Sequence, residues 1–502
     1  MDPTVLSIDI GTSRTKAVVS AADGRIIGRT EGTYPLKAGP GGKAEQDPAA
    51  WVRAVTDCVR RIAAACEAGW PPSVCSVTGQ MHGLVLLDRR GKVLRDALIC
   101  SDFRASEELV RIEGEVSPDR VLRITGSPGL AMFPGPKLLW VQHHEPQVYG
   151  QIGRILMPKD YIGFVMTGEI ATDPSDASGT MMYNIQQSRW DEDLCRASGA
   201  SGDFLPPVLP ATAMRGNIQR AFARRSGIPE GTPVIVGGGD LPTTVIGAGL
   251  VDDRAIGVSL GTAGIVFRLA SRLREELLGR IFHFRHAVSD GFVSMGSQPG
   301  TGFSLNWFEK QVLHRRTSKI PEGDYAAIAE EVSLFFLPFL LGTGSPYMNY
   351  RPQGAFLGLS FHHNRADLRL AILQGISYSL RQSFELLNAT KAPVNRIVVC
   401  AGGSYNQAWL QVLSEILGCP LTTLRYKDTA VVGASILGGL SCGWFNDLEE
   451  GVKRFVRPET VIEPRNEHID VYERAYRKYL EYCQELRTAG GASQWPEQQQ
   501  TR

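Results

Sequence analysis

The sequence predicts an α/β protein built from two large halves. Its 502 residues are too many for one comfortable hydrophobic core, so surface-to-volume scaling favours two or three domains. Short β-rich runs alternate with long amphipathic helical patterns, which is typical of sheets covered by helices. A strand, a Gly-Thr turn and a second strand near the N-terminus recur at 255–269, and this recurrence indicates an internal duplication.

The composition argues against several classes of protein. The formal net charge is +1, so no global field would hold the chain on nucleic acid or on an anionic membrane. The longest apolar runs, such as 334–341, are much shorter than the roughly 20 residues of a membrane helix. The first residues lack the basic and apolar regions of a secretory signal. We therefore expect a cytoplasmic protein with small-molecule partners, no nucleic-acid partner and no membrane partner.

The nine cysteines are spread from Cys58 to Cys483 and include no C-x-x-C pair. This spacing argues against a zinc site and against a disulfide framework. We expect reduced thiols that are mostly buried as small hydrophobic side chains.

The first half begins with three short strands, expected at 5–10, 15–21 and 25–30. Asp23-Gly24 between the second and third strands is a strong hairpin signal. We therefore expect three adjacent antiparallel strands.

A loop and a long helix follow these strands. The polar, glycine-rich stretch 37–47 predicts a loop, and the proline at position 48 begins an amphipathic helix that extends to 65. Strand patterns then recur, and a helix-like run begins at Thr243. The further strands of this half are expected at 74–78, 85–87, 93–94 and 233–236.

In the second half, Gly261-Thr262 lies between two apolar strands as Gly11-Thr12 does in the first half. Long helices and one strand follow. The helices are expected at 368–387, 408–417 and 430–440, and the strand at 396–400. The C-terminal residues are polar and rich in glutamine, so we expect 486–502 to form a disordered tail.

The two Gly-Thr turns are candidate phosphate-binding loops. Glycine lets backbone N–H groups approach a phosphate closely, and hydroxyl side chains add further donors. Each turn taken alone is equally explained as an ordinary hairpin turn. The chain has no G-x-x-x-x-G-K-[ST] and no G-x-G-x-x-G, which disfavours a P-loop fold and a Rossmann dehydrogenase.

A third glycine cluster, 401–406, follows the strand expected at 396–400 and precedes a helix. This arrangement suits the close passage of a flat or anionic ligand. A tight connection between strand and helix explains it equally well.

Several segments, taken in their order along the chain, resemble the FGGY family of carbohydrate kinases, and within it the xylulokinases. The resemblance covers roughly residues 4 to 485 and implies two actin-like, ribonuclease-H-like domains with a cleft between them. The implied domains are 1–245, which binds the sugar and carries the catalytic aspartate, and 246–485, which binds the nucleotide. The matching segments are 9–13 (DIGTS), 45–48 (EQDP), 79–83 (GQMHG), 136–140 (PKLLW), 144–146 (HEP), 156–161 (LMPKDY), 175–180 (SDASGT), 237–240 (GGGD), 259–264 (SLGTAG) and 401–406 (AGGSYN).

The resemblance implies an ATP-dependent kinase that phosphorylates a sugar hydroxyl. A ketopentose such as D-xylulose, giving the 5-phosphate, is the leading acceptor, and another ketose or a polyol is the alternative. Phosphoryl transfer needs positioning and neutralisation of charge, so the implied cofactors are ATP and Mg²⁺. Asp240 would be the general base that removes the proton of the acceptor hydroxyl. Asp9, with Asp240, would hold Mg²⁺; without the resemblance, a buried Asp9 would simply accept hydrogen bonds from nearby N–H groups.

The resemblance also implies two sets of binding residues. His82 alone would be explained as a satisfied core histidine, but its motif places it in the sugar pocket. The implied substrate-binding residues are Met81, His82, Asp102, Arg104 and Asp240. The implied nucleotide-binding residues are Gly11, Thr12, Ser13, Lys16, Gly261, Thr262, Gly264, Gly402, Gly403 and Asn406.

Three departures from the xylulokinase pattern leave the acceptor sugar open. Leu241 replaces a polar residue after the base, so a hydrogen bond worth about 1 kcal/mol is missing or replaced. Thr343 and Gly344 replace two charged residues, and Cys100 replaces a tryptophan. Individual hydroxyl contacts determine specificity in such a site. We therefore expect these changes to affect which sugar is phosphorylated more than the phosphoryl transfer itself.

Two other classes of function remain open. One is a family member that has lost catalysis and binds a sugar as a regulatory protein. The other is an actin-like or chaperone-like ATPase, which would share the phosphate loops but would not need the GQMHG segment. The resemblance also suggests a homodimer, which the sequence itself does not test.

Overall fold

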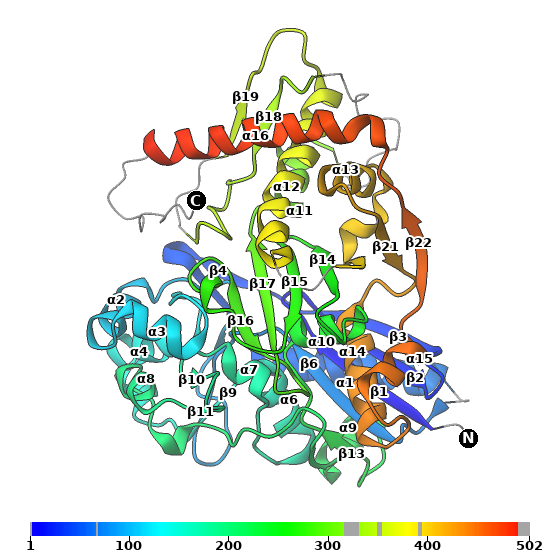
Figure 1. Ribbon diagram of the computed structural model, residues 1–502. Helices are drawn as coiled ribbons and strands as arrows, with labels where there is room; N and C mark the ends of the chain where they lie inside the picture. Colours follow the sequence, from blue (N-terminus) through cyan, green and yellow to red (C-terminus); the bar gives the residue numbers. More distant parts are fainter. Residues whose placement is uncertain (1–2, 67–68, 316–330, 349–353, 390–393, 490–502) are drawn as a thin grey trace.

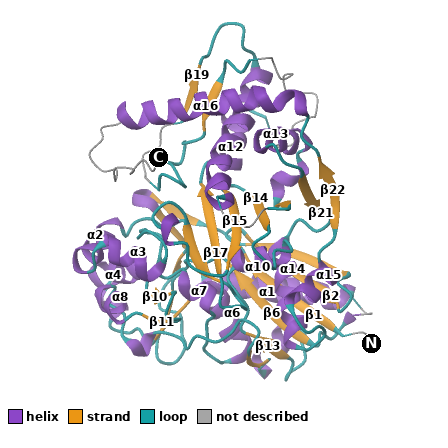
Figure 2. Ribbon diagram, viewed as in Figure 1, coloured by secondary structure: helices purple, strands orange, loops and turns teal. Residues whose placement is uncertain are grey.

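The computed structural model describes residues 3–66, 69–315, 331–348, 354–389 and 394–489, which form two sheet-centred halves (Figure 1). Each half has one large sheet with helices packed beside it (Figure 2). Among the described residues, no helix combines the length and apolar character that crossing a bilayer requires.

The N-terminal half is built on a sheet with the strand order β12-β13-β6-β1-β2-β3. Strand β1 lies inside this sheet, and all seven of its residues are buried. The strands are β1 (Thr4–Ile10), β2 (Arg14–Ala21), β3 (Ile26–Thr33), β6 (Val74–Gly79), β12 (Met214–Asn217) and β13 (Pro233–Ile235).

The C-terminal half is built on a sheet with the order β16-β17-β15-β14-β20-β21-β22. The strands are β14 (Ala255–Leu260), β15 (Gly264–Ala270), β16 (Phe282–Arg285), β17 (Phe292–Gln298), β20 (Arg396–Cys400), β21 (Leu421–Leu424) and β22 (Pro458–Ile462).

The topology of the two sheets confirms the predicted duplication. Strand β1 pairs antiparallel with β2 and parallel with β6, and β14 pairs antiparallel with β15 and parallel with β20. A third antiparallel strand extends each hairpin, β3 in one half and β17 in the other. The two Gly-Thr turns therefore occupy equivalent positions in the two sheets.

The long helices begin where the sequence supplies caps. Asp47 accepts a hydrogen bond from Ala49 N (2.9 Å) at the start of α1, and Asn364 forms a capping box with Asp367 at the start of α12. The predicted helix 48–65 has these same bounds in the structure. The longer helices are α1 (Pro48–Ala65), α2 (Ser106–Glu115), α3 (Pro118–Thr125), α4 (Pro134–His144), α6 (Pro158–Thr167), α10 (Asp240–Gly247), α12 (Arg365–Asn388), α13 (Gln407–Leu417), α14 (Thr429–Ser441), α15 (Leu448–Phe455) and α16 (Asn466–Ala489).

Short elements complete the fold. The short helices are α5 (Pro146–Tyr149), α7 (Pro174–Ser178), α8 (Glu192–Ala197), α9 (Arg220–Ser226) and α11 (Thr301–Trp307). The short strands are β4 (Lys37–Gly39), β5 (Lys43–Gln46), β7 (Val85–Leu87), β8 (Ala97–Leu98), β9 (Arg154–Leu156), β10 (Tyr183–Asn184), β11 (Arg189–Trp190), β18 (Phe335–Leu337) and β19 (Ala355–Leu357).

The structure corrects three local predictions. The stretch 37–47 is not a loop, because β4 and β5 pair with each other and β5 also pairs with β8. The helix expected from Thr243 begins three residues earlier, at Asp240. The predicted tail 486–502 is too long, since α16 extends to Ala489, and 490–502 lie outside the described residues.

The cysteine prediction is confirmed. None of the nine thiols forms a disulfide, and most are buried; Cys442 is exposed, and Cys100 and Cys419 are half-buried. Six buried small side chains add to the cores of the two halves.

The two halves meet where helix α10 crosses helix α14, near the centre of Figure 1. At this crossing, a glycine of each helix lies directly against the backbone of the other helix. A Cβ atom at Gly247 would lie 1.9 Å from Thr429 O, and one at Gly433 would lie 1.9 Å from Thr243 O. Helix α14 also packs on the N-terminal sheet, where Ser435 Oγ lies 2.8 Å from Ser7 Oγ. The start of α10, and hence Asp240, is therefore held by both halves.

Candidate active site

The site forms at the carboxyl ends of neighbouring parallel strands. Asp9 lies near the end of β1, Gln80 to His82 follow β6, and Asp240 follows β13 as the first residue of α10. Strand β1 is parallel to β6, and a bridge joins Gly79 to Gly239. Carboxyl ends of parallel strands meet at one edge of a sheet, which brings these three segments together.

Two carboxyl groups, the buried Asp9 and the half-buried Asp240, influence each other at this edge. Burial and, to a smaller extent, the nearby Asp9 raise the pKa of Asp240 to about 7, against the effect of the backbone N–H groups of Leu241 and Met81. Burial also raises the pKa of Asp9 to about 6, against the effect of Lys16. Asp9 is 7% exposed, and its Oδ1 has no hydrogen-bond partner among the described residues. The expected convergence of the two acids is present.

The first Gly-Thr hairpin is held by hydrogen bonds to its carbonyl groups. Gly11 N donates to Arg14 O (3.0 Å) and closes the turn. Tyr34 Oη donates to Gly11 O, and Gln46 Nε2 donates to Thr12 O (2.7 Å). These contacts use the carbonyl oxygens and leave Ser13 exposed, so the hairpin presents its hydroxyl side to solvent.

The second hairpin is held by the start of α11. Gly261 N donates to Ala263 O (3.1 Å), and Gly302 N donates to Gly261 O (3.2 Å). Thr262 is exposed. Gly264 has a packing role, because a Cβ there would lie 2.4 Å from Thr301 Oγ1.

The three residues predicted around adenosine differ in surroundings. A Cβ at Gly402 would meet no atom within 4 Å, whereas one at Gly403 would lie 2.6 Å from Leu260 Cβ. Asn406 Oδ1 accepts a hydrogen bond from Trp409 N (3.0 Å) and caps α13. Gly402 alone therefore adjoins open space, and the structure gives Gly403 and Asn406 structural roles.

Lys16 has a partner that the sequence did not indicate. Its Nζ lies 2.5 Å from Asp428 Oδ1, and Arg29 lies 2.8 Å from Asp428 Oδ2. Asp428 precedes α14 in the C-terminal half, so these ion pairs join the two halves beside Asp9. No local pattern could reveal Asp428, because 412 residues separate it from Lys16.

Met81 and His82 lie against the segment that carries Asp240. A Cβ at Gly239 would lie 3.0 Å from Met81 Sδ, so the thioether packs on the backbone beside the carboxylate. His82 adopts φ 64°, an uncommon conformation for a residue other than glycine, and its Nδ1 lies 2.8 Å from Gly179 O. Burial lowers the pKa of His82 to about 4. The imidazole is thus neutral, Nδ1–H donates to the carbonyl, and Nε2 is left as an acceptor.

Asp102 and Arg104 form an internal ion pair. Asp102 is fully buried; its Oδ2 accepts from Ala44 N (2.7 Å) and lies 2.6 Å from Arg104 Nη2. The same Arg104 nitrogen lies 2.9 Å from Glu45 Oε1, and its guanidinium stacks on Trp140. These contacts hold Asp102 inside the turn that follows β8 and carries Cys100; its predicted contact with the substrate stays a prediction.

Comparisons with known proteins place this site in a family. The FGGY family of carbohydrate kinases, N-terminal domain, matches residues 4–247, and the C-terminal domain of that family matches residues 257–442. The chain belongs to the FGGY family of carbohydrate kinases. It is 31% identical over 490 residues to the xylulose kinase of Bacillus subtilis, covering 97% of this chain and 98% of that protein.

Two further relatives of this FGGY kinase extend the comparison. A gluconokinase of Bacillus subtilis is 28% identical and covers 89% of both chains. A solved structure described as a xyloylose kinase from Brucella ovis is 27% identical, has a TM-score of 0.87, and covers 97% of this chain and 100% of that chain. The likeness confirms the predicted fold class and the ATP-dependent carbohydrate kinase activity of the family.

The residues that depart from the xylulokinase pattern lie close to the FGGY site. Cys100 Sγ lies 3.6 Å from Gln80 Oε1 and 3.9 Å from Thr12 Oγ1, between the phosphate hairpin and the GQMHG segment. Leu241 is buried in the core shared by the two halves. Gly344 N donates to Gln298 Oε1 (3.0 Å), at the end of β17.

Lys137, which the sequence did not single out as a site residue, links the His82 turn to the segment before Cys100. Its Nζ donates to His82 O (2.8 Å) and to Ile99 O (2.6 Å), and burial lowers its pKa to about 7. This lysine fixes the His82 turn relative to the strand that leads into Cys100. The PKLLW segment that contains it was a motif of the resemblance, which is the signal that could have found it.

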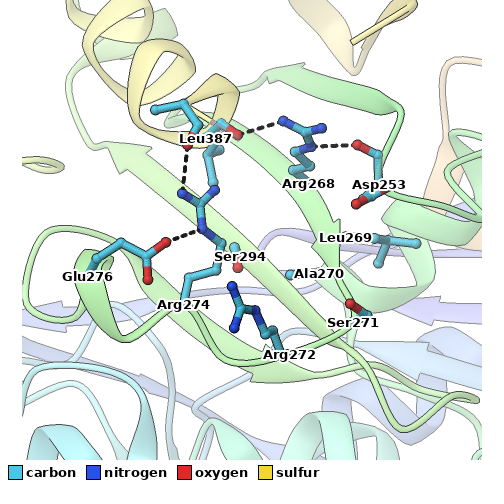
Figure 3. Close-up of a pocket in the computed structure, with 11 residues that line it drawn as sticks. Asp253, Arg268, Leu269, Ala270, Ser271, Arg272, Arg274, Glu276, Ser294 and Leu387 are labelled. Atoms are coloured by element: carbon cyan, nitrogen blue, oxygen red, sulfur yellow. Dashed lines mark hydrogen bonds and ion pairs between the residues drawn. The ribbon is translucent and has the colours of Figure 1, made fainter. Parts of the chain in front are cut away.

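A charged cavity of about 500 Å³ lies elsewhere, at the far end of β15 (Figure 3). Arg268 Nη1 donates to Leu387 O (2.8 Å), and Arg274 Nη2 donates to Ala389 O (3.0 Å). Both arginines thus bind carbonyl groups at the C-terminal end of α12, where cations are stabilised. Helix capping accounts for the positive charge of this cavity.

Proposed function

We propose that this kinase transfers the γ-phosphoryl group of ATP to the 5-hydroxyl of D-xylulose. The observation that carries the proposal is the pair of interacting carboxyl groups, Asp9 and Asp240, at the carboxyl ends of β1 and β13 on either side of β6 and beside a Gly-Thr hairpin. Asp9 would hold the Mg²⁺ that neutralises charge on the phosphates, and Asp240 would accept the proton of the sugar hydroxyl. An actin-like ATPase would need only the first of these functions.

Asp240 would act as the general base. Its pKa is about 7, close to neutral pH. A general base with such a pKa is ionised in a large fraction of molecules and is still basic enough to accept a proton. The hydroxyl proton passes to Asp240, the sugar oxygen bonds to the γ-phosphorus, and the bond from that phosphorus to the bridging oxygen of ADP breaks. Met81, which adjoins the same segment, would pack on the sugar, and the neutral His82 would accept a hydrogen bond from a sugar hydroxyl through Nε2.

The two hairpins would hold the phosphates from opposite halves of the chain. The hydroxyl groups of Thr12, Ser13 and Thr262 are available there, and backbone N–H groups can approach closely at glycine. Lys16 adds a cation at the same end of β1, which supports its predicted role beside the phosphates. Adenosine would lie close to Gly402, because this glycine adjoins open space.

The residues at Asp9 fit a magnesium ion. Its carboxylate is a hard oxygen donor, it is buried, and one oxygen lacks a hydrogen-bond partner among the described residues. Among those residues no three His, Cys, Asp or Glu side chains gather into a metal-binding group. A magnesium ion that takes most of its ligands from phosphate and water would need only Asp9 here, with Asp240 facing it. Bound Mg²⁺ would neutralise charge that develops on the phosphoryl oxygens.

The choice of xylulose rests on the relatives. The first curated relatives are xylulose kinases that match over nearly the whole chain. The gluconokinase relative makes gluconate the second candidate, and the departures at Cys100 and Leu241 fall where the acceptor would be distinguished.

The test is coupled ADP release over a panel of ketoses, aldoses, polyols and gluconate. We expect sugar-dependent turnover that is greatest with D-xylulose. Asp240→Asn should abolish turnover and leave binding of ATP, measured by calorimetry, largely intact. Asp252→Asn changes a half-exposed aspartate beyond the C-terminal end of α10, so it is the matched control and should retain full activity.

Two outcomes would contradict the proposal. Retained turnover in Asp240→Asn would exclude Asp240 as the base. Sugar binding without ADP release across the whole panel would favour a regulatory sugar-binding protein, and ADP release that ignores sugar would favour an ATPase.

A further inference from the structure

A cluster of five charged groups is buried behind Asp240. It consists of Lys159 and Asp160 on α6, Asp173 and Asp176 around the start of α7, and Arg215 on β12. Lys159, Asp160, Asp173 and Asp176 are fully buried, and the side chain of Arg215 is also fully buried. We call this set the α6–α7 cluster. Sequence reasoning missed it, although LMPKDY and SDASGT were both motifs of the resemblance.

The three carboxyl groups of the cluster have very different partners. Asp160 Oδ1 lies 2.7 Å from Lys159 Nζ and 2.7 Å from Arg215 Nη2. Asp173 lies 3.0 Å from Lys159 Nζ and accepts hydrogen bonds from Ser175 N (2.9 Å), Ser175 Oγ and Asp176 N. Asp176 approaches Lys159 only at 3.6 Å, and neither of its oxygens has a hydrogen-bond partner among the described residues.

The charges of this cluster do not balance if all five groups are ionised. Three carboxylates face two cations, which leaves one excess negative charge in a region without exposure to solvent. An uncompensated buried charge is far more costly than a buried neutral carboxyl group, so one of the three acids should hold a proton. The proton belongs on the acid with the weakest stabilisation of its negative charge.

We infer that Asp176 is a neutral carboxylic acid at neutral pH and serves as a positioning residue behind the catalytic base. Asp160 has two cationic partners and Asp173 has one cation and three hydrogen-bond donors, whereas Asp176 has one distant cation. The charged and titratable groups that face Asp176 are Lys159, Asp160, Asp173 and Asp240. Burial and the three neighbouring acids raise its pKa well above the usual range, against the effect of Lys159.

The position of Asp176 gives its neutrality a function, which rests on the proposed role of Asp240. Gly239 N, in the residue before Asp240, donates to Ser175 Oγ (3.1 Å), so the cluster holds the backbone that carries the base. A Cβ at Gly179 would lie 2.7 Å from His82 Nδ1, so the end of α7 also supports the sugar pocket. A second charged carboxylate here would repel the ionised Asp240 and favour its protonation. A neutral Asp176 fills the same space without repelling the negative charge of Asp240.

The stability of Asp176→Asn tests the protonation state. If Asp176 is neutral, the folded state binds a proton that the unfolded state releases above about pH 4, so stability contributed by this site falls as pH rises. The amide has nearly the same shape as the neutral acid and holds no proton. Asp176→Asn should therefore unfold at a higher temperature than the wild type at about pH 8, and the difference should shrink toward about pH 4.

Asp173→Asn is the matched control, because Asp173 has a close cationic partner and three hydrogen-bond donors. It should lower the unfolding temperature throughout the same pH range, since a buried ion pair is broken. If Asp176→Asn behaves like Asp173→Asn, Asp176 is a carboxylate and the inference is wrong. These unfolding measurements do not depend on activity, so their failure is distinct from failure of the proposed function.

Two further measurements test the role of Asp176 behind Asp240. At about pH 8, where Asp9 and Asp240 are largely ionised, the infrared C=O band of protonated carboxyl groups should be weaker in Asp176→Asn than in the wild type. The amide substitution should leave the acidic limb of the pH profile of kcat/KM in place, because the charge beside Asp240 does not change. A limb that moves to lower pH in Asp176→Asn would show that a negative charge had been removed, and would overturn the inference.

Discussion

The crossing of α10 and α14 predicts that one added methyl group, in Gly433→Ala, lowers both activity and stability. A Cβ at Gly433 would lie 1.9 Å from Thr243 O, 2.7 Å from its carbonyl carbon and 3.1 Å from Gly247 N. All three neighbours are backbone atoms, so no side-chain rotation can relieve the overlap. In a close-packed interface, the two helices must therefore separate by about 1 Å.

This separation would reach the active site through Thr243. Thr243 Oγ1 donates to Gly239 O (3.0 Å), so Thr243 lies one turn from Asp240 and moves with it. A displacement of about 1 Å at a catalytic group lowers the rate on the order of 10²-fold. Overpacking at such a contact lowers the free energy of unfolding by about 1–3 kcal/mol.

The assay compares kcat and the denaturant midpoint of Gly433→Ala with those of the wild type. Gly114→Ala is the matched control, because Gly114 lies in α2 and a Cβ there would meet no atom within 4 Å. The control should keep its kcat and gain about 0.5–1 kcal/mol from better helix propensity. Wild-type kcat and stability in Gly433→Ala would refute the tight crossing and its connection to Asp240.

Three further predictions concern the charges in and near the site. Below about pH 7, kcat/KM should fall about tenfold per pH unit, because Asp240, whose pKa is about 7, must be ionised to accept the proton. His82→Gln should lower activity without moving the acidic limb of the kcat/KM profile, because the pKa of His82 is about 4. If that limb moves in His82→Gln, the titrating group is His82 and not Asp240. Asp428→Asn should lower the free energy of unfolding by about 1 kcal/mol or less, measured by denaturant titration, because its pairs with Lys16 and Arg29 are partly exposed. A loss above about 3 kcal/mol would instead indicate a buried ion pair.

Much of the site could be predicted because its components are local. Asp9 and the Gly11 turn lie within one hairpin, and Asp240 directly follows a glycine run, so short motifs in a fixed order indicated both acids. Strand and helix patterns depend on neighbouring residues, which is why the helix 48–65 and the strand 396–400 have the predicted bounds. The repeated hairpin likewise indicated the duplication that the two sheets confirm.

Two features that sequence reasoning did not predict depend on contacts between distant segments. The stretch 37–47 carries turn residues, but β5 finds a partner in β8, about 50 residues along the chain. The burial of Asp102 is likewise decided by its contacts with Ala44 and Arg104 and by the fold around them, and its predicted contact with the sugar stays a prediction. Sequence patterns do not report which side chains lose contact with water.

The sequence by itself therefore determined the α/β class, the duplicated hairpins and the two acids of the proposed transfer. Only the tertiary structure decided the charges around them: the pairing of Lys16 with Asp428 across the two halves, and the burial of Asp176 behind Asp240. Motifs follow from covalent spacing and local backbone preference. Ionisation follows from desolvation and from the distances between groups, and both exist only once remote segments have packed together.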